Sequence, residues 1–111
     1  MSICQGVNFT EIAREWRCKW SEDGDKAALV ALQQTLDAHL SALKSVEGSV
    51  RVQRVVCGGC HDFKVISSVS VEKFAAWEAQ EFAPEKEFLA AVSAIPGVSQ
   101  VETQTFTIAD M

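Results

Sequence analysis

Hydrophobic positions along the chain follow two different periods. Between residues 12 and 20 they alternate with polar ones, so that Trp16, Cys18 and Trp20 share one side of an extended segment, which predicts a strand. After an acidic turn at 21–25, leucines recur at steps of three and four residues, the spacing of one helix face; they are Leu29, Leu32, Leu36, Leu40 and Leu43. The chain is therefore predicted to begin with a strand followed by a helix.

Later segments repeat this unit. Two extended runs, 50–56 and 62–69, predict a pair of strands, and a third run, 98–108, predicts the last strand. A second helical region covers 71–82, with Ser70 in the position of an N-cap. The predicted order is strand, helix, strand, strand, helical region, strand.

Glycine follows both helical regions, as it commonly does where the backbone turns left-handed at a helix end. Gly48 precedes the run 50–56, and Gly97 precedes the last strand. Within the second region Pro84 interrupts the helix and suits the first position of a new one. Helix, glycine and strand form the second half of a β-α-β unit, and two such units predict β-α-β-β-α-β.

This order predicts a ferredoxin-like sandwich of the α+β class in one domain spanning 1–111. Its four-stranded antiparallel sheet would carry the helices on one face. Trp16 and Trp20 occupy one side of the first strand, and Phe63 and Ile66 point to opposite sides of another, so both sheet faces are expected to carry apolar groups. Because such a face is rarely left uncovered, we expect a homodimer with its sheets paired face to face.

Charge narrows the range of partners. The chain has 10 lysines and arginines against 15 aspartates and glutamates, a formal net charge of −5. This acidic balance, without a basic cluster, argues against nucleic acid and anionic membrane surfaces as partners. The N-terminus lacks the basic and apolar runs of a signal peptide, and no segment has the ~20 apolar residues of a membrane span. We therefore expect a cytoplasmic protein.

Three segments of the chain resemble a known family. Residues 55–66, 71–77 and 83–89 are similar to stress-responsive dimeric α+β barrel proteins, and more loosely to antibiotic-biosynthesis monooxygenases. The resemblance implies a ferredoxin-like protomer and a dimer built around a shared barrel. It also implies a cavity for apolar substrates between sheet and helices, because polyketide cyclases and monooxygenases among the relatives use that space.

The chain departs from this family where acid–base groups are expected. Relatives often carry a tyrosine and a His-Pro-x-His group in the second helical region. Here Pro84 matches the proline, but Ala83 precedes it, Lys86 replaces the second histidine, and the chain contains no tyrosine. Proton transfer at that position lacks its usual groups, which favours a non-catalytic protein.

Four interpretations fit the motif Cys57-Gly58-Gly59-Cys60-His61. C-x-x-C-H is the attachment signature of c-type haem, and the two thiols with His61 could supply two or three zinc ligands. A C-x-x-C pair can also be redox-active, usually at a helix N-terminus. The hairpin context favours a two-residue glycine turn with positive φ and the two thiols facing each other. On this interpretation we expect no cofactor.

Candidate ligand contacts come from both helical regions and the sheet. Alanine is frequent in these helices, and its small side chain predicts a hollow above the sheet; the residues are Ala27, Ala28, Ala31, Ala75, Ala76, Ala79, Ala90 and Ala91. His39 lies beside the leucine stripe and is the expected polar contact. The expected ligand-binding set is His39, Trp77, Phe82, Phe88 and Phe63.

The favoured function is therefore a dimeric, non-catalytic protein that holds a lipophilic small molecule between sheet and helices. A fatty-acid-like or polyketide-like compound would suit such a site. One alternative is a small cofactor-free enzyme of the polyketide cyclase or monooxygenase type, with His39 as its base. The other is a redox or metal protein that uses Cys57 and Cys60.

Overall fold

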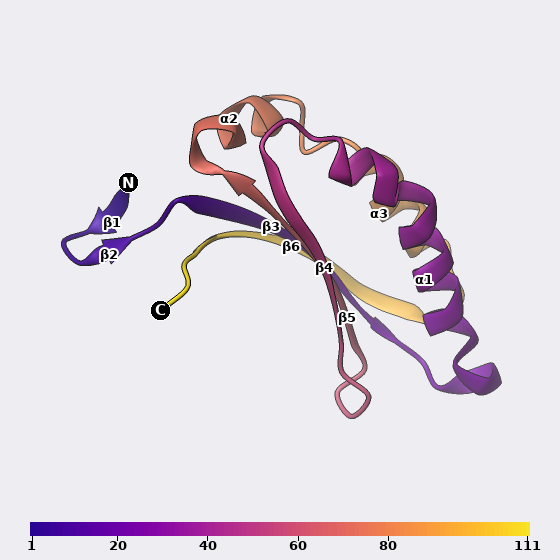
Figure 1. Cartoon of the computed structure of the whole chain (residues 1–111). Helices are drawn as coiled ribbons and strands as arrows, with labels where there is room; N and C mark the ends of the chain where they lie inside the picture. Colours follow the sequence, from indigo (N-terminus) through magenta and orange to yellow (C-terminus); the bar gives the residue numbers. More distant parts are fainter.

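A four-stranded antiparallel sheet with helices on one face forms the body of the protein (Figure 1). The computed structural model describes residues 1–111. Along the chain its elements are β1 (Ser2–Cys4), β2 (Val7–Asn8), β3 (Glu11–Trp20), α1 (Asp23–Lys44), β4 (Ser49–Val56), β5 (Asp62–Ser70), α2 (Val71–Ala79), α3 (Glu85–Ser93) and β6 (Val98–Ile108). The strand order β4-β5-β3-β6 is that of a ferredoxin-like fold, which confirms the predicted class.

Strand and helix positions agree closely with the sequence pattern, except at the start of α1, where residues 24–26 take left-handed backbone angles, and where the second helical region ends. Helix α2 stops at Ala79 rather than at residue 82, because Glu81 and Phe82 take left-handed backbone angles of φ 55° and 56°. Gly48 and Gly97 have the predicted positive φ, of 85° and 90°. They lie in the turns that enter β4 and β6, however, because α1 and α3 already end at Lys44 and Ser93 with right-handed caps. Ser70 occupies the N-cap position of α2, although its side chain makes no capping hydrogen bond.

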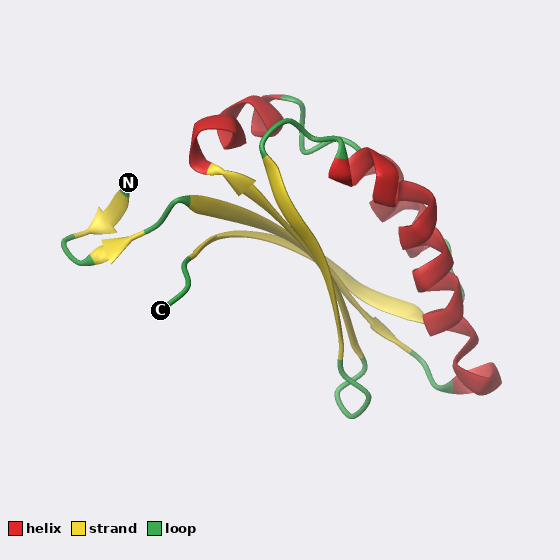
Figure 2. Ribbon diagram, in the orientation of Figure 1, coloured by secondary structure: helices red, strands yellow, loops and turns green.

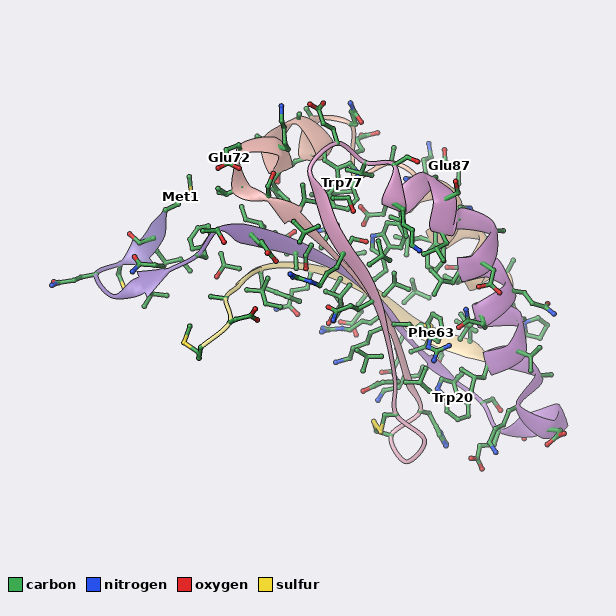
Figure 3. All side chains as sticks on the ribbon, viewed as in Figure 1. Met1, Trp20, Phe63, Glu72, Trp77 and Glu87 are labelled. Carbon is green, nitrogen blue, oxygen red and sulfur yellow. A yellow bond between two sulfur atoms is a disulfide. The ribbon has the colours of Figure 1, made fainter.

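The hydrophobic core lies between the sheet and the helices. Strand pairing brings Cys18 opposite Phe63 and Trp16 opposite Val65, so the large side chains of β3 and β5 share one face. All of these are buried, and the inner faces of α1 and α3 cover them with Leu32, Leu36, Phe88 and Val92. Figure 3 shows Phe63 and Trp20 on the side of the sheet that faces α1.

The opposite face of the sheet carries apolar groups, as predicted, but charged side chains outnumber them. Charged side chains of β3 alternate with the buried tryptophans and form ion pairs along this face: Glu11 with Arg51, Arg17 with Glu15 and Glu102, and Lys19 with Asp62. The large apolar residues on this face are Val55, Ile66, Phe106 and Ile108. The strict period of two explains the difference, because it sends every large apolar residue of β3 to the helix side.

A short hairpin precedes the main sheet. Strands β1 and β2 pair only with each other, and Figure 2 shows this hairpin projecting beyond the sheet near the C-terminus. Its apolar side chains are exposed: Met1 by 76%, Ile3 by 68% and Val7 by 47%. We refer to residues 1–8 as the N-terminal arm. No helix of the protein combines the length and hydropathy of a membrane-spanning segment.

Candidate functional site

The hollow predicted beneath the alanine-rich helices is absent. The space enclosed by Trp16, Phe63, Phe88 and their neighbours measures about 10 Å³, roughly the minimum that one water molecule requires. Most of the alanines lie on exposed helix faces, whereas leucine, phenylalanine and valine side chains point inward. The core is therefore solid above the centre of the sheet.

A larger apolar groove lies at the end of the sheet, beneath α2. Its volume of about 650 Å³ falls within the range of about 300–1,000 Å³ that is usual for small-molecule sites. The sheet, α2 and the N-terminal arm each supply part of the lining, which consists of Ile12, Thr105, Phe106, Thr107, Val71, Phe74, Ala75, Glu78, Met1 and Ile3. We call this the α2 groove. It places a ligand-sized apolar space between sheet and helix.

A charged pair lies beside the α2 groove. Arg14 Nη2 donates to Glu85 Oε1 at 2.7 Å, and Arg14 Nη1 donates to Thr105 Oγ1 at 2.9 Å. Only 16% of the Arg14 side chain and 10% of the Glu85 side chain are exposed. The guanidinium carbon also lies 4.1 Å from the centre of the Phe82 ring, which is a cation–π contact. Because Thr105 lines the groove and accepts from Arg14, its hydroxyl proton remains available to a ligand oxygen.

Two buried donors accompany this pair. Arg14 Nε and Trp16 Nε1 are both buried and have no hydrogen-bond partner. Buried polar groups are normally paired, so two unpaired donors on adjacent inward positions of β3 are unusual. This part of β3 therefore has two buried hydrogen-bond donors that no other group of the protein uses.

Aromatic residues connect the charged pair with α2. The rings of Phe74, Trp77 and Phe82 lie 5.2–6.1 Å apart, and Trp77 Nε1 donates to the carbonyl oxygen of Ala83 at 2.9 Å. The left-handed turn at 81–82 directs Phe82 inward from the segment between the two helices. Of the predicted ligand contacts, Trp77 and Phe82 therefore lie next to the groove, whose wall Phe74 forms.

The remaining predicted contacts lie elsewhere. Phe63 and Phe88 are core residues, each 2% exposed. His39 packs edge-on against Phe88 with ring centres 5.5 Å apart, and its Nδ1 lies 2.8 Å from the Thr35 carbonyl oxygen of its own helix. His39 lines neither the α2 groove nor the small space beneath Trp16 and Phe88. The structure thus separates these three residues from Trp77 and Phe82.

Sequence reasoning missed Arg14, Glu85 and Thr105. A signal for Arg14 was present, because it occupies the same alternating register as Trp16 and Cys18 and is the one charge on that side of β3. Glu85 gave no such signal, since an acid in the first turn of a helix is ordinarily solvated. Its burial depends on how α3 packs against the sheet.

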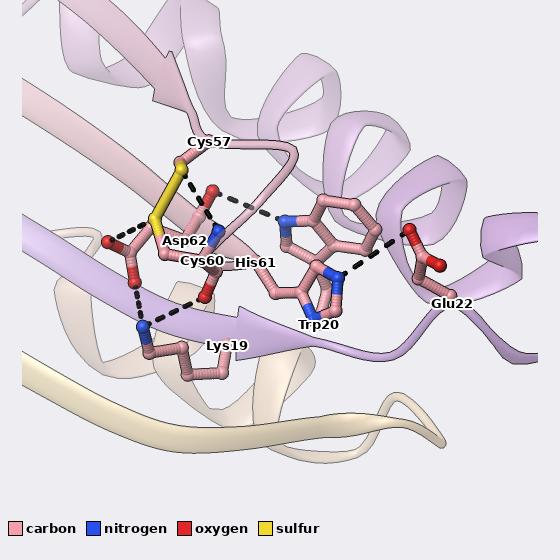
Figure 4. Close-up of a disulfide and its surroundings, with 7 residues drawn as sticks. All are labelled: Lys19, Trp20, Glu22, Cys57, Cys60, His61 and Asp62. Atoms are coloured by element: carbon pink, nitrogen blue, oxygen red, sulfur yellow. Dashed lines mark hydrogen bonds and ion pairs between the residues drawn. A yellow bond between two sulfur atoms is a disulfide. The ribbon is translucent and has the colours of Figure 1, made fainter.

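The cysteine motif forms the tip of the β4–β5 hairpin, and Cys57 and Cys60 are joined in a disulfide (Figure 4). The prediction of a two-residue glycine turn is wrong in detail, because residues 57–61 form the loop and the positive φ belongs to His61, not to Gly58 or Gly59. The disulfide engages the two thiols that haem attachment or zinc binding would use. No three His, Cys, Asp or Glu side chains gather in a metal-binding arrangement.

Cys18 differs from the pair at the hairpin tip. It is a buried core residue, as its position between two tryptophans predicted. Burial, with a smaller contribution from the charge of Asp62, raises the pKa of the Cys18 thiol to about 11. Cys18 is therefore protonated at neutral pH, and its role is packing.

Comparisons with known proteins identify the fold. A putative antibiotic biosynthesis monooxygenase from Deinococcus radiodurans superposes with a TM-score of 0.67 at 11% identity, covering 90% of this chain and 94% of that one. SnoaB, a cofactor-independent oxygenase from Streptomyces nogalater, gives 0.60 at 16% identity, with 92% and 96% covered. A dimeric ferredoxin-like protein from an uncultured marine organism gives 0.61 at 12% identity, with 92% and 90% covered.

Comparison of the sequence alone found no match. No family model matches the chain, and no curated protein matches it. The solved structures therefore establish a shared ferredoxin-like fold, as the sequence resemblance implied. This fold carries many activities, so the residues of the site, and not the fold, determine the function.

Proposed function

We propose that the protein is a homodimeric binding protein for a lipophilic small molecule, and that the α2 groove is its binding site. The groove itself carries this proposal, because seven of its ten lining residues are hydrophobic and its volume fits a ligand of moderate size. The hydroxyls of Thr105 and Thr107 add polar contacts at one side. A fatty-acid-like or polyketide-like compound would combine the apolar body and the oxygen atoms that these contacts require.

The shape of the protomer supports a dimer. Its radius of gyration is 14.9 Å, whereas a compact domain of this length has about 13 Å. The sheet face opposite the helices has no cover from its own chain, and a protein of similar fold is described as dimeric. Pairing of these open faces would leave most of the α2 groove accessible, since Ile12, Phe74 and Thr105 lie on the helix side and only Phe106 of its sheet residues belongs to the open face.

An enzymatic function remains the second candidate. A similar fold serves as a cofactor-independent oxygenase in another protein, and the buried Arg14–Glu85 pair places charged groups next to an apolar site. These residues suit such chemistry better than His39, whose Nδ1 faces a backbone carbonyl oxygen. Turnover of an aromatic polyketide with uptake of oxygen would identify this function.

Thermal stability tests the binding proposal. Palmitate and an aromatic polyketide serve as probes, and a ligand at about 100 times its Kd adds about 2.7 kcal/mol of stability. For a domain of this size the melting temperature should rise on the order of 10 °C. Ala75→Leu fills the groove and should abolish the rise, while Ala79→Leu, on an exposed part of the same helix, should leave it unchanged.

Two results would contradict the proposal. One is the absence of stabilisation by either probe; the other is an equal loss of stabilisation in both variants. Thr105→Val offers a further check, because it removes the hydroxyl while keeping the shape of the side chain. It should weaken binding of the carboxylate probe by about tenfold or more, because a hydrogen bond to a charged group contributes about 1.5–3 kcal/mol.

A further inference from the structure

The β4–β5 hairpin tip holds an exposed disulfide whose two sulfur atoms have different surroundings. The backbone N–H of Cys60 donates to Cys57 Sγ at 3.1 Å. Asp62 Oδ2 instead lies 3.3 Å from Cys60 Sγ, as Figure 4 shows. We propose that Cys57 and Cys60 form a thiol–disulfide exchange site for a small monothiol, with Cys60 as the sulfur attacked and Cys57 as the leaving thiolate.

In other C-x-x-C sites the N-terminus of a helix stabilises the thiolate, and here the backbone N–H of Cys60 has that position. An N–H aimed at sulfur stabilises the thiolate form, and a more stable thiolate leaves faster. The carboxylate of Asp62 has the opposite effect on Cys60, because a nearby negative charge disfavours a thiolate. Cys57 is therefore the better leaving group of the pair.

Access also favours attack at Cys60. Cys60 is exposed at the loop, whereas Cys57 is partly covered. Lys19 Nζ donates to Asp62 Oδ1 at 2.6 Å and to the Cys60 carbonyl oxygen at 2.9 Å. This ammonium group offsets much of the carboxylate charge that an approaching thiolate meets, and it lowers the pKa of Asp62. It also fixes the loop that presents the disulfide.

The rest of the loop is held independently of the disulfide. Cys57 N–H donates to the Asp62 carbonyl oxygen at 3.0 Å, and both the backbone N–H and the indole N–H of Trp20 donate to carbonyl oxygens of residues 61 and 62. The hairpin can therefore keep its form when the S–S bond opens. A bond that is dispensable for the loop and exposed to solvent suits exchange better than structural support.

The exchange proceeds in two balanced steps. A monothiol thiolate attacks Cys60 Sγ, forming a mixed disulfide while the Cys57–Cys60 bond breaks and its electron pair leaves on Cys57 Sγ. A second monothiol thiolate attacks the monothiol sulfur of that mixed disulfide, which releases Cys60 as a thiolate. Two monothiols are oxidised to one disulfide, and the protein gains two electrons and, on protonation, two protons.

Alkylation of single-cysteine variants tests the asymmetry. In the full-length protein, Cys60→Ser leaves Cys57 with its N–H donor, and Cys57→Ser leaves Cys60 beside Asp62. After reduction, iodoacetamide at pH 7 should modify Cys57 about tenfold faster than Cys60, since about one pKa unit separates their thiolate populations. Mass spectrometry of each modified peptide gives both rates. Equal rates, or faster modification of Cys60, would overturn the assignment.

Reduction of the oxidised protein tests the exchange itself. Millimolar reduced glutathione, as the monothiol probe, should open the disulfide within minutes. Asp62→Asn should speed this step by about fivefold, because it removes a charge next to the attacked sulfur. Glu47→Gln makes the same charge change at the far end of β4 and should have no effect. A disulfide that resists glutathione for hours, or an equal response to both variants, would show a purely structural bond.

Discussion

At the scale of single residues, the buried Arg14–Glu85 pair is the most unusual feature of the protein. Charges that are withdrawn from water must be compensated by a partner and by further hydrogen bonds. Glu85 and Thr105 provide this for the guanidinium, and Phe82 covers its face. The pair is held where the groove, the aromatic cluster and α3 meet. Loss of one partner should therefore affect stability and the site together.

Replacement of Glu85 tests this account. Glu85→Ala leaves the Arg14 charge largely buried without its carboxylate and should lower the free energy of unfolding by about 3 kcal/mol. Glu87→Ala removes an exposed carboxylate from the same first turn of α3 and should cost less than about 0.5 kcal/mol. Urea denaturation measures both. A similar small loss in the two variants would show that burial of the pair contributes little.

At the scale of elements, the helix ends decide how the helices meet the sheet. Gly48 is the left-handed residue in the turn between α1 and β4, and its backbone also passes very close to α2. A Cβ atom built on Gly48 would lie 2.5 Å from the Lys73 Cβ atom. The sequence predicted the left-handed backbone at Gly48, whereas its close approach to α2 depends on how the elements pack. Gly58 and Gly59 differ, because neither has a positive φ and a Cβ at either would meet open space.

Alanine substitutions should separate these two kinds of glycine. Gly48→Ala combines a strained backbone with a steric clash and should destabilise the protein by about 2–3 kcal/mol. Gly58→Ala should change stability by less than about 0.5 kcal/mol, since its position has space and an ordinary φ. Thermal and urea unfolding of the two variants provide the comparison. A tolerated Gly48→Ala would mean that α2 can shift away from α1 at little cost.

At the scale of the whole molecule, the two faces of the sheet have separate roles. The helix side carries the core and the α2 groove, and the open side carries rows of ion pairs with a few apolar residues among them. A dimer through this open face would therefore depend on charge complementarity as well as apolar contact. The sequence pattern predicted the apolar contacts of this face but not its ion pairs.

A lysine on each face tests the dimer. At micromolar concentration the protein should sediment with twice its mass of 12.1 kDa. Ile66→Lys introduces a charge on the open face opposite Glu15, which can pair with it, and should yield a folded monomer. Val30→Lys adds the same charge at an exposed position of α1 and should remain dimeric. A dimer that survives Ile66→Lys would place the interface elsewhere, and a compact wild-type monomer would contradict the dimer altogether.

The sequence was sufficient for the order of elements because local rules control it. The alternation around Trp16, the leucine stripe of α1 and the glycines after the helices each depend on neighbouring residues, and all three appear in the structure. The resemblance to dimeric α+β barrel proteins pointed to the same fold, which the solved structures confirm. Ferredoxin-like architecture was therefore predictable from this chain.

Tertiary structure alone decided where the candidate site lies. Alanine content predicted a hollow above the sheet, but helix rotation turned most alanines outward and filled the interior with larger side chains. The α2 groove and the Arg14–Glu85 pair join residues up to 91 positions apart, from the strand β3, the helix α3 and the last strand. Period and propensity describe contacts within a few residues, whereas such long-range contacts depend on how the elements pack. The sequence determined the elements and their order, and packing determined the groove, its charges and the polar character of the open face.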